Sequence, residues 1–191
     1  MKTQIFISLK ILGMMILLLG IIYPLFITGI AQVFFHDKSN GSLLKKNGIV
    51  IGSALIGQQF DNKAYFTSRP SASGYNTLPS GASNLSLTSK KLHEQVIQRK
   101  KEFIAVNKLP SDQIIPSEML FASGSGLDPH ISPQAALLQV ERIAEARDFS
   151  NGQKQKLKII IENNTEKPLW NWLGETKINV LLLNLQLDEI K

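Results

Sequence analysis

One long apolar run dominates the pattern of hydrophobic and polar positions along this chain. Residues 11–35 contain no charged side chain, and Lys10, His36 and Asp37 bound the run. A helix of that length would measure about 37 Å, against roughly 30 Å for the hydrocarbon core of a bilayer. A signal peptide would have a shorter apolar core and a small-x-small cleavage site, and no clear site of that kind follows. The pattern therefore predicts a retained membrane anchor over residues 1–36.

Small and helix-perturbing residues interrupt the apolar run. Gly13 and Gly20 are seven positions apart and fall on similar faces of a helix, where they let another helix approach closely. Pro24, which can kink the helix, and Gly29 lie further along. These four residues are a candidate packing face for a partner helix, although glycine is also simply common in membrane helices.

The lysines on either side of the run bear on its orientation. Lys2 and Lys10 favour an N-terminus in the cytoplasm, whereas Lys38, Lys45 and Lys46 pull the other way. Charge alone therefore leaves the direction of the span open.

Beyond the span, residues 37–191 alternate between strand-like and helix-like patterns. Residues 48–60, rich in β-branched side chains and glycine, predict a strand with a bend or a close backbone approach. Residues 63–72 and 114–121 predict two further strands. The continuous apolar run 178–187 predicts a central strand that is covered on both faces. These segments would together form one sheet.

Three helices are predicted between the strands. Residues 88–107 and 153–163 carry apolar side chains at helical spacing, and a hydroxyl residue can cap the first of them. Ser132 and Pro133 are a good N-cap and first position for another helix that runs to about Arg147. The predicted fold class is α+β: one N-terminal transmembrane helix followed by a single soluble domain with a mixed β-sheet and about three helices.

Composition narrows the classes of function. The chain carries 21 Lys and Arg against 15 Asp and Glu, but the basic excess is scattered, whereas a nucleic-acid binder concentrates it in a patch. The absence of cysteine excludes disulfides and thiolate metal ligands, and three histidines make a multi-histidine metal site unexpected. We therefore predict no nucleic-acid partner and no metal.

The most varied chemistry lies in one loop, which reads S-G-S-G-L-D-P-H. Its members are Ser123, Gly124, Ser125, Gly126, Leu127, Asp128, Pro129 and His130. A serine, Asp128 and His130 are the residue types of a hydrolytic triad, and Ser125 is the first candidate nucleophile. The chain has no G-x-S-x-G elbow, however, and residues two apart need not meet. The alternative, which we favour, is a shaped loop or interaction surface, because its glycines permit unusual backbone angles and Asp-Pro promotes a turn.

Two nearby features have open interpretations. Arg69 could bind an anion or bridge loop carbonyls as a structural residue. A glycine-rich loop before a helix can bind phosphate, but Pro133 removes one N–H donor and no Walker lysine follows. The residues therefore assign no cofactor site to this chain.

Several motifs resemble one family. S-G-S-G-L-D-P-H-I-S-P and the following A-A-L-L-Q-V-E-R-I-A-E-A-R closely resemble the signature of the C subunit of Kdp-type high-affinity potassium-transporting ATPases. Further similar segments, in the same order along the chain, are Tyr23–Gln32, Gly52–Phe60, Tyr65–Ala72, Ser80–Leu85 and Leu173–Asn184. Thr67, Ser68 and Ala82 depart from the family pattern without weakening the resemblance.

The resemblance implies a subunit of the cytoplasmic membrane that is accessory and has no active site of its own. Its N-terminus would be cytoplasmic and residues 37–191 extracytoplasmic. The implied partners are a channel-like potassium-translocating subunit, a P-type ATP-hydrolysing subunit and a small membrane peptide. The family is described as a catalytic chaperone that raises the nucleotide affinity of the ATP-hydrolysing subunit, so ATP is expected within the complex rather than as a cofactor of this chain.

Overall fold

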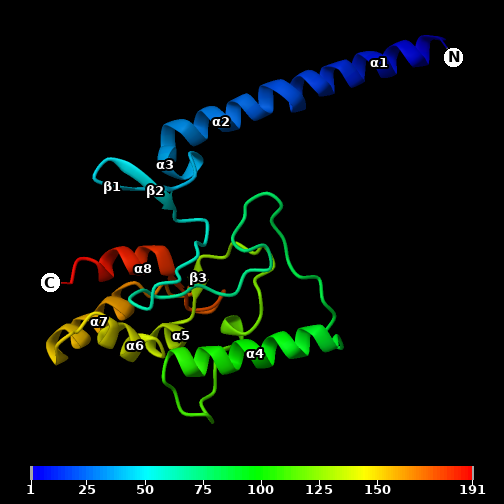
Figure 1. Ribbon diagram of the computed structural model, residues 1–191. Helices are drawn as coiled ribbons and strands as arrows, with labels where there is room; N and C mark the ends of the chain where they lie inside the picture. The colour runs from blue at the N-terminus through cyan, green and yellow to red at the C-terminus, as the bar shows by residue number, and fades with distance from the viewer. Residues whose placement is uncertain (1, 191) are drawn as a thin grey trace. The chain divides into compact units, whose positions relative to one another are not determined.

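The structure is a computed structural model that describes residues 2–190 and divides the chain into two compact units, Met1–Ser53 and Ala54–Lys191. The first unit consists mainly of one long helix followed by a small hairpin (Figure 1). Its elements are α1 (Lys2–Leu17), the π-helical turn η1 (Leu18–Ile22), α2 (Tyr23–Phe34), the short α3 (His36–Ser39) and the antiparallel strands β1 (Leu43–Lys46) and β2 (Ile49–Ser53).

The long helix runs through α1, η1 and α2 and matches the predicted span. Over Lys2–Phe34 it is long and apolar enough to cross a membrane. Pro24 lies in the first turn of α2, directly after η1, and the Tyr23 N–H donates to Leu18 O, five residues back. Proline has no N–H and crowds the preceding turn, so a wider π-helical turn beside it keeps the helix continuous.

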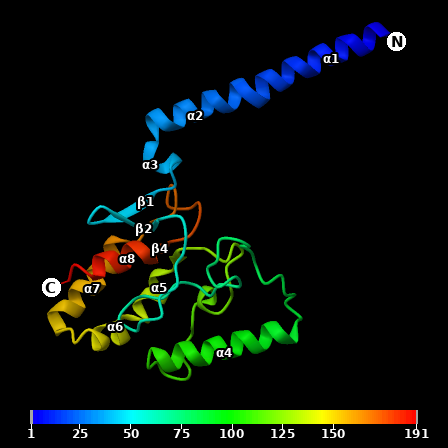
Figure 2. The same ribbon diagram turned by 45° about the horizontal axis from the view of Figure 1, so that its top comes forward.

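The second unit carries the remaining elements, mostly helices (Figure 2). These are α4 (Lys90–Val106), the 3₁₀ turn η2 (Ser117–Met119), β3 (His130–Ile131), α5 (Pro133–Leu137), α6 (Val140–Ala146), α7 (Asn151–Asn163), β4 (Ile178–Asn179) and α8 (Val180–Leu187). The α+β class is confirmed. Among residues 2–190 the strands form two separate antiparallel pairs, β1–β2 and β3–β4, where one mixed sheet was expected.

The three predicted helices of this unit are present, because their start signals are local. Ser89 caps α4 by accepting from the Leu92 N–H, and Ser132 caps α5 by accepting from the Ala135 N–H at 3.1 Å, with Pro133 as its first residue. The second predicted helix is broken at Leu138 and Gln139 into α5 and α6.

The strand predictions were largely wrong. The apolar run 178–187 is a strand only at β4; from Val180 it is the helix α8, capped by the Asn179 side chain, which accepts from the Leu182 N–H at 3.2 Å. A short continuous apolar run does not reveal its period, and this one is rich in leucine, a good helix former. Residues 114–121 contain η2, and the predicted strand 48–60 shrinks to β2.

The segment 63–72 is not a strand: it begins with a turn at Lys63 and Ala64, and from Phe66 onward side-chain amides take the place of a neighbouring strand. The Phe66 N–H donates to Asn184 Oδ1 at 2.8 Å, and Asn184 Nδ2 donates to Phe66 O at 2.9 Å. The Thr67 N–H donates to Gln139 Oε1 at 2.8 Å. Both amides are buried, and each satisfies backbone groups that would otherwise be costly to bury.

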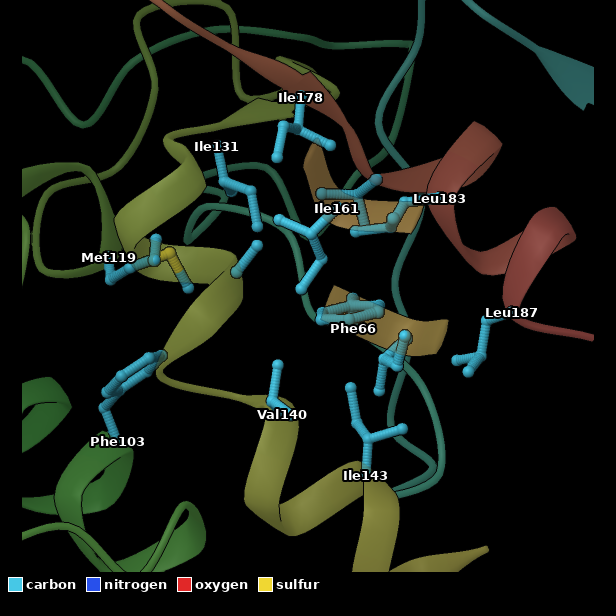
Figure 3. Close-up of a cluster of buried hydrophobic side chains, with 14 of the residues drawn as sticks. Phe66, Phe103, Met119, Ile131, Val140, Ile143, Ile161, Ile178, Leu183 and Leu187 are labelled. Carbon is cyan, nitrogen blue, oxygen red and sulfur yellow. The ribbon is translucent and has the colours of Figure 1, made fainter. Parts of the chain in front are cut away.

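Phe66 lies fully buried in the hydrophobic core (Figure 3). Side chains from β3, α6, α7, β4 and α8 share this core, and the labelled ones around it point toward the same interior space. Its almost fully buried members include Ile131, Val140, Ile143, Leu157, Ile161, Ile178, Val180, Leu183 and Leu187. The segment is therefore fixed by the burial of Phe66 and by the two amides that bind Phe66 and Thr67, and these contacts position Arg69 three residues further on.

Candidate functional site

The loop over residues 123–130, here called the signature loop, is held in place by contacts with a second loop. Gly126 has φ +72°, and a Cβ there would lie 2.7 Å from Ser73 Oγ and 2.9 Å from Gly81 O. Ser71 Oγ donates to Gly126 O at 2.7 Å. The expected need for glycine is thus confirmed at Gly126, where both the backbone angle and the space exclude a side chain. It was wrong at Gly124, whose φ is not positive and where a Cβ would meet nothing within 4 Å.

A second glycine lets another segment reach the signature loop. The Gly57 N–H donates to Leu127 O at 2.7 Å, and a Cβ on Gly57 would lie 2.8 Å from Asp128 O. The close approach of two backbones explains why this position has no side chain. The sequence analysis expected a strand with a bend or a close backbone approach over residues 48–60; the close approach is confirmed at Gly57, which does not lie in a strand.

Asp128 is the polar centre of the signature loop. Its Oδ1 accepts from the His130 N–H at 3.0 Å and lies 3.1 Å from His130 Nδ1, while Oδ2 accepts from Arg69 Nη1 at 2.8 Å. Burial alone would raise the pKa of Asp128, but the hydrogen bonds from His130 and Arg69 outweigh it and lower the pKa to about 2. The carboxylate is therefore ionised at any physiological pH, and Arg69 acts as its counter-ion.

Tyr75, in the second loop that contacts the signature loop, holds Arg69 in place. The Tyr75 hydroxyl donates to Arg69 O, and Ser71 Oγ accepts from the Tyr75 N–H at 2.9 Å. Burial, followed by the negative charge of Asp61, raises the pKa of Tyr75 to about 12, so the phenol stays protonated and remains a donor. Arg69 is thus held at both its backbone and its side chain, but its guanidinium pairs with a carboxylate rather than with the loop carbonyls expected of a structural arginine.

The candidate triad is assembled only in part. Asp128 and His130 meet, which is the geometry of a base and its orienting acid. Ser125 Oγ instead accepts from the Leu127 N–H at 3.0 Å within its own turn. Ser123 is 3% exposed, and its N–H donates to Pro70 O. Among the hydrogen bonds described for residues 2–190, none joins a serine hydroxyl to His130.

A surface hollow of about 490 Å³ opens beside the signature loop. Its lining mixes both signs of charge, with Arg69 and Lys177 opposite Glu118, Asp128 and Glu175. Such a lining suits a polar protein surface better than a phosphate, because acidic groups would repel the anion. The residues between them are Ser117, Phe121, His130, Ile131, Ser132 and Thr176.

The buried, charged side chain of Arg142 joins the helices to the segment 63–72. The Arg142 guanidinium donates to Asn107 Oδ1 at 2.8 Å, to Gln139 Oε1 at 2.8 Å and to Lys63 O. Burial lowers the pKa of Arg142 to about 10, so the group stays charged near neutral pH. Sequence reasoning missed Arg142 and Gln139, since nothing local marks a polar residue in α6 as buried.

The candidate packing residues of the span are all present in the long helix. A Cβ on Gly13 or Gly29 would meet nothing within 4 Å, and one on Gly20 would lie 4.0 Å from its own helix at Ile16 Cγ2. These glycines therefore leave open surface on the helix, as a close helix–helix approach requires. Their role in binding a partner stays a prediction.

Within residues 2–190, one N-terminal helix is long and apolar enough to span a membrane, and an α+β unit follows it, an arrangement that indicates a membrane protein. The family described as "K+-transporting ATPase, c chain" (KdpC) matches residues 5–189. The chain belongs to this family, as the resemblance of its motifs led us to expect.

Individual relatives agree with the family match. The chain is 46% identical to a Potassium-transporting ATPase KdpC subunit of Leptospira interrogans over 182 residues, which are 95% of this chain and 92% of the relative. It is 44% identical to the KdpC subunit of Mycobacterium tuberculosis over 192 residues, covering both chains fully. The KdpC subunit of Clostridioides difficile is 39% identical over 189 residues, 90% of this chain and 89% of the relative.

Proposed function

We propose that this chain is a non-catalytic accessory subunit of a high-affinity, ATP-driven potassium uptake complex. Its span anchors it and packs on a membrane partner through the Gly13, Gly20, Pro24 and Gly29 face. The rest of the chain, residues 37–191, is an extracytoplasmic domain that stabilises the assembly. The partners are a channel-like potassium-translocating subunit, a P-type ATP-hydrolysing subunit and a small membrane peptide.

The observation that carries this proposal is the family match over residues 5–189, together with the state of the signature loop. Asp128 is neutralised by Arg69, and Ser125 Oγ is occupied by a backbone N–H. Both groups serve the shape of the loop, and this arrangement supports a surface for a partner rather than a reaction centre.

The regulatory part of the proposal is that the subunit raises the ATP affinity of the ATP-hydrolysing subunit. A domain outside the cytoplasm cannot reach cytoplasmic ATP, so the effect must pass through the assembled membrane subunits. This chain can change the ATP affinity of its partner without contacting ATP, provided that the domain binds one conformation of its partners better than another.

The test compares the purified complex with and without this chain. We expect removal to lower both the recovery of intact complex and the apparent ATP affinity in potassium-stimulated hydrolysis. Gly20→Leu and Pro24→Leu variants should release the chain from the complex, with Leu12→Ala as the control on the span. Normal co-purification of both variants would contradict the proposed packing face, and unchanged ATP affinity without the chain would contradict the chaperone role.

A membrane-anchored hydrolase that uses Ser125, Asp128 and His130 is the second candidate, because Asp128 and His130 are in contact at 3.1 Å. It predicts that a serine-reactive phosphonate labels Ser125 and that Ser125→Ala abolishes labelling. We expect no labelling, since Ser125 Oγ is engaged with Leu127 N–H. Direct ATP binding by residues 37–191 is tested separately, by saturable crosslinking of an ATP analogue in the intact complex.

A further inference from the structure

The connection between α7 and β4 carries an exposed aromatic tip. Its residues Leu169, Trp170, Trp172 and Leu173 are 58%, 70%, 73% and 49% exposed. The two indoles are stacked, with ring centroids 6.3 Å apart. In Figure 2 this connection, coloured orange to brown, loops out from the helices of its unit. Large apolar side chains gathered at a projecting tip mark an interaction surface.

The tip is rigidly presented, although it packs on nothing large. Two antiparallel bridges, Glu166 with Lys177 and Leu169 with Leu173, close the connection as a narrow hairpin. The Leu169 N–H donates to Leu173 O at 3.0 Å, and the reverse bond is also 3.0 Å. Trp170 has φ +54°, a left-handed angle that is unusual for a bulky residue. The fold thus holds the indoles outward at some conformational cost instead of burying them.

We propose that the tip of residues 169–173 docks into the interfacial layer of the lipid bilayer that holds the chain's own span. Tryptophan suits this layer, because its apolar ring and its N–H donor match the boundary between acyl chains and headgroups. The inference rests on the span and not on the proposed function.

The length of the tether supports a bilayer as the partner. The span ends at Phe34 and the second unit begins at Ala54, so only the short segment between them separates the domain from the membrane. A unit of this size has a radius of gyration of about 14 Å. The segment therefore tethers the domain within reach of the headgroups. Because the span already keeps the chain bound to the membrane, a small tip is enough to orient the domain.

The size of the patch favours lipid over a protein partner. The four side chains expose roughly 500 Å², taking about 250 Å² for a fully exposed tryptophan. A stable protein interface buries more, about 800 Å² per partner. Along the chain, the apolar run is interrupted by Asn171 and ends at Gly174 and Glu175. Lys167, at its near edge, complements anionic headgroups, while Glu175 opposes them, so the apolar side chains carry the docking.

The chain contains its own reporter, since Trp170 and Trp172 are its two tryptophans. The full chain is reconstituted in vesicles of phosphatidylethanolamine and phosphatidylglycerol, with and without lipids brominated on the upper acyl chain. We expect emission at shorter wavelength than in urea, loss of most emission with brominated lipid, and protection from acrylamide. Trp170→Phe and Trp172→Phe, measured singly, show whether each indole reaches the lipid while the hairpin is kept.

The matched control moves the reporter to another exposed apolar position. Leu87 is 88% exposed in a different loop, so Leu87→Trp in the Trp170→Phe, Trp172→Phe background should remain accessible to acrylamide and insensitive to brominated lipid. Equal quenching at Leu87 would mean general adsorption and would overturn the proposal. Native tryptophans that brominated lipid does not quench would also overturn it. A blue shift that appears only in the assembled complex in detergent would assign the tip to a protein partner instead.

Discussion

The signature loop and the tryptophan tip lead into the two strands of the same small sheet, yet they are built in opposite ways. The signature loop precedes β3 and is fastened to residues far away along the chain, through Arg69, Ser71 and Gly57. The tip precedes β4 and is closed only on itself, by the bridge between Leu169 and Leu173. The polar groups of the signature loop form contacts within the domain, whereas the apolar side chains of the tip remain exposed and can bind a partner. Four predictions test this difference, from the largest expected effect to the smallest.

The largest effect is expected at Gly126. Gly126→Ala forces a left-handed residue and a Cβ into contact with Ser73 Oγ and Gly81 O. We expect a loss of about 3 kcal/mol in the free energy of unfolding. Urea unfolding followed by circular dichroism measures it. Gly124→Ala is the matched control and should change stability by no more than about 0.5 kcal/mol; equal effects at both glycines would show that the loop is not held as described.

Gly57→Ala should have the next largest effect. The new methyl group would meet Asp128 O at 2.8 Å, so either the 2.7 Å hydrogen bond to Leu127 O or the signature loop itself must shift. We expect a loss of about 2 kcal/mol in the free energy of unfolding. Gly152→Ala, in the first turn of α7, is the control; it has room and should be neutral or stabilising by about 0.5 kcal/mol.

The Asp128 ion pair predicts a pH dependence. The pKa of Asp128 is about 2 in the folded chain against an ordinary value of 3.8, so the folded state binds its proton less tightly than the unfolded state. The stability contributed is present above about pH 4 and is lost as the pH falls from 4 to 2. Since Asp128 keeps some exposure, we expect about 1 kcal/mol.

Asp128→Asn checks this by removing the titration. Its unfolding free energy should fall less steeply than that of the unmodified chain over the same acid range. His130 contacts the same carboxylate, so Arg69→Gln serves as a second variant that weakens the pair while leaving Asp128 and His130 in place. Parallel pH profiles for the unmodified chain and Asp128→Asn would show that the carboxylate is not stabilised by its partners.

The smallest effect is expected at the tip, and it has the opposite sign. Trp170→Gly removes a bulky residue from a left-handed angle and should stabilise the chain in detergent by about 0.5 kcal/mol. Trp172→Gly relieves no such strain and should not stabilise it. A clear loss of stability for Trp170→Gly would mean that the indole packs internally and that the contrast between the two loops is false.

Features that depend on residues close together in the sequence were predictable, and features that depend on distant residues were not. The span and the caps at Ser89 and Ser132 were predictable, because a helix start depends on neighbours within one turn. The contact of Asp128 with His130 is equally local. The partner of Asp128, Arg69, lies 59 positions away, and no local pattern names it.

The wrong strands have the same explanation. In residues 63–72, the side chains of Asn184 and Gln139 bind the backbone at Phe66 and Thr67 and take the place of the expected sheet. Residues 180–187 are a helix because Asn179 caps them and the core surrounds them, facts that a uniformly apolar run does not disclose. The tip was not singled out at all, since two tryptophans in a hairpin look like core residues until their exposure is known.

The pairing of Phe66 with Asn184 also sets the order in which the domain can form during synthesis. These residues are 118 positions apart, so the centre of the core cannot form until α8 has been synthesised. We expect nascent chains that end before Val180 to be cut readily by protease within residues 54–179, and chains extended past Leu187 to be resistant. The span is therefore synthesised well before the domain behind it can fold, so we expect membrane insertion to precede folding.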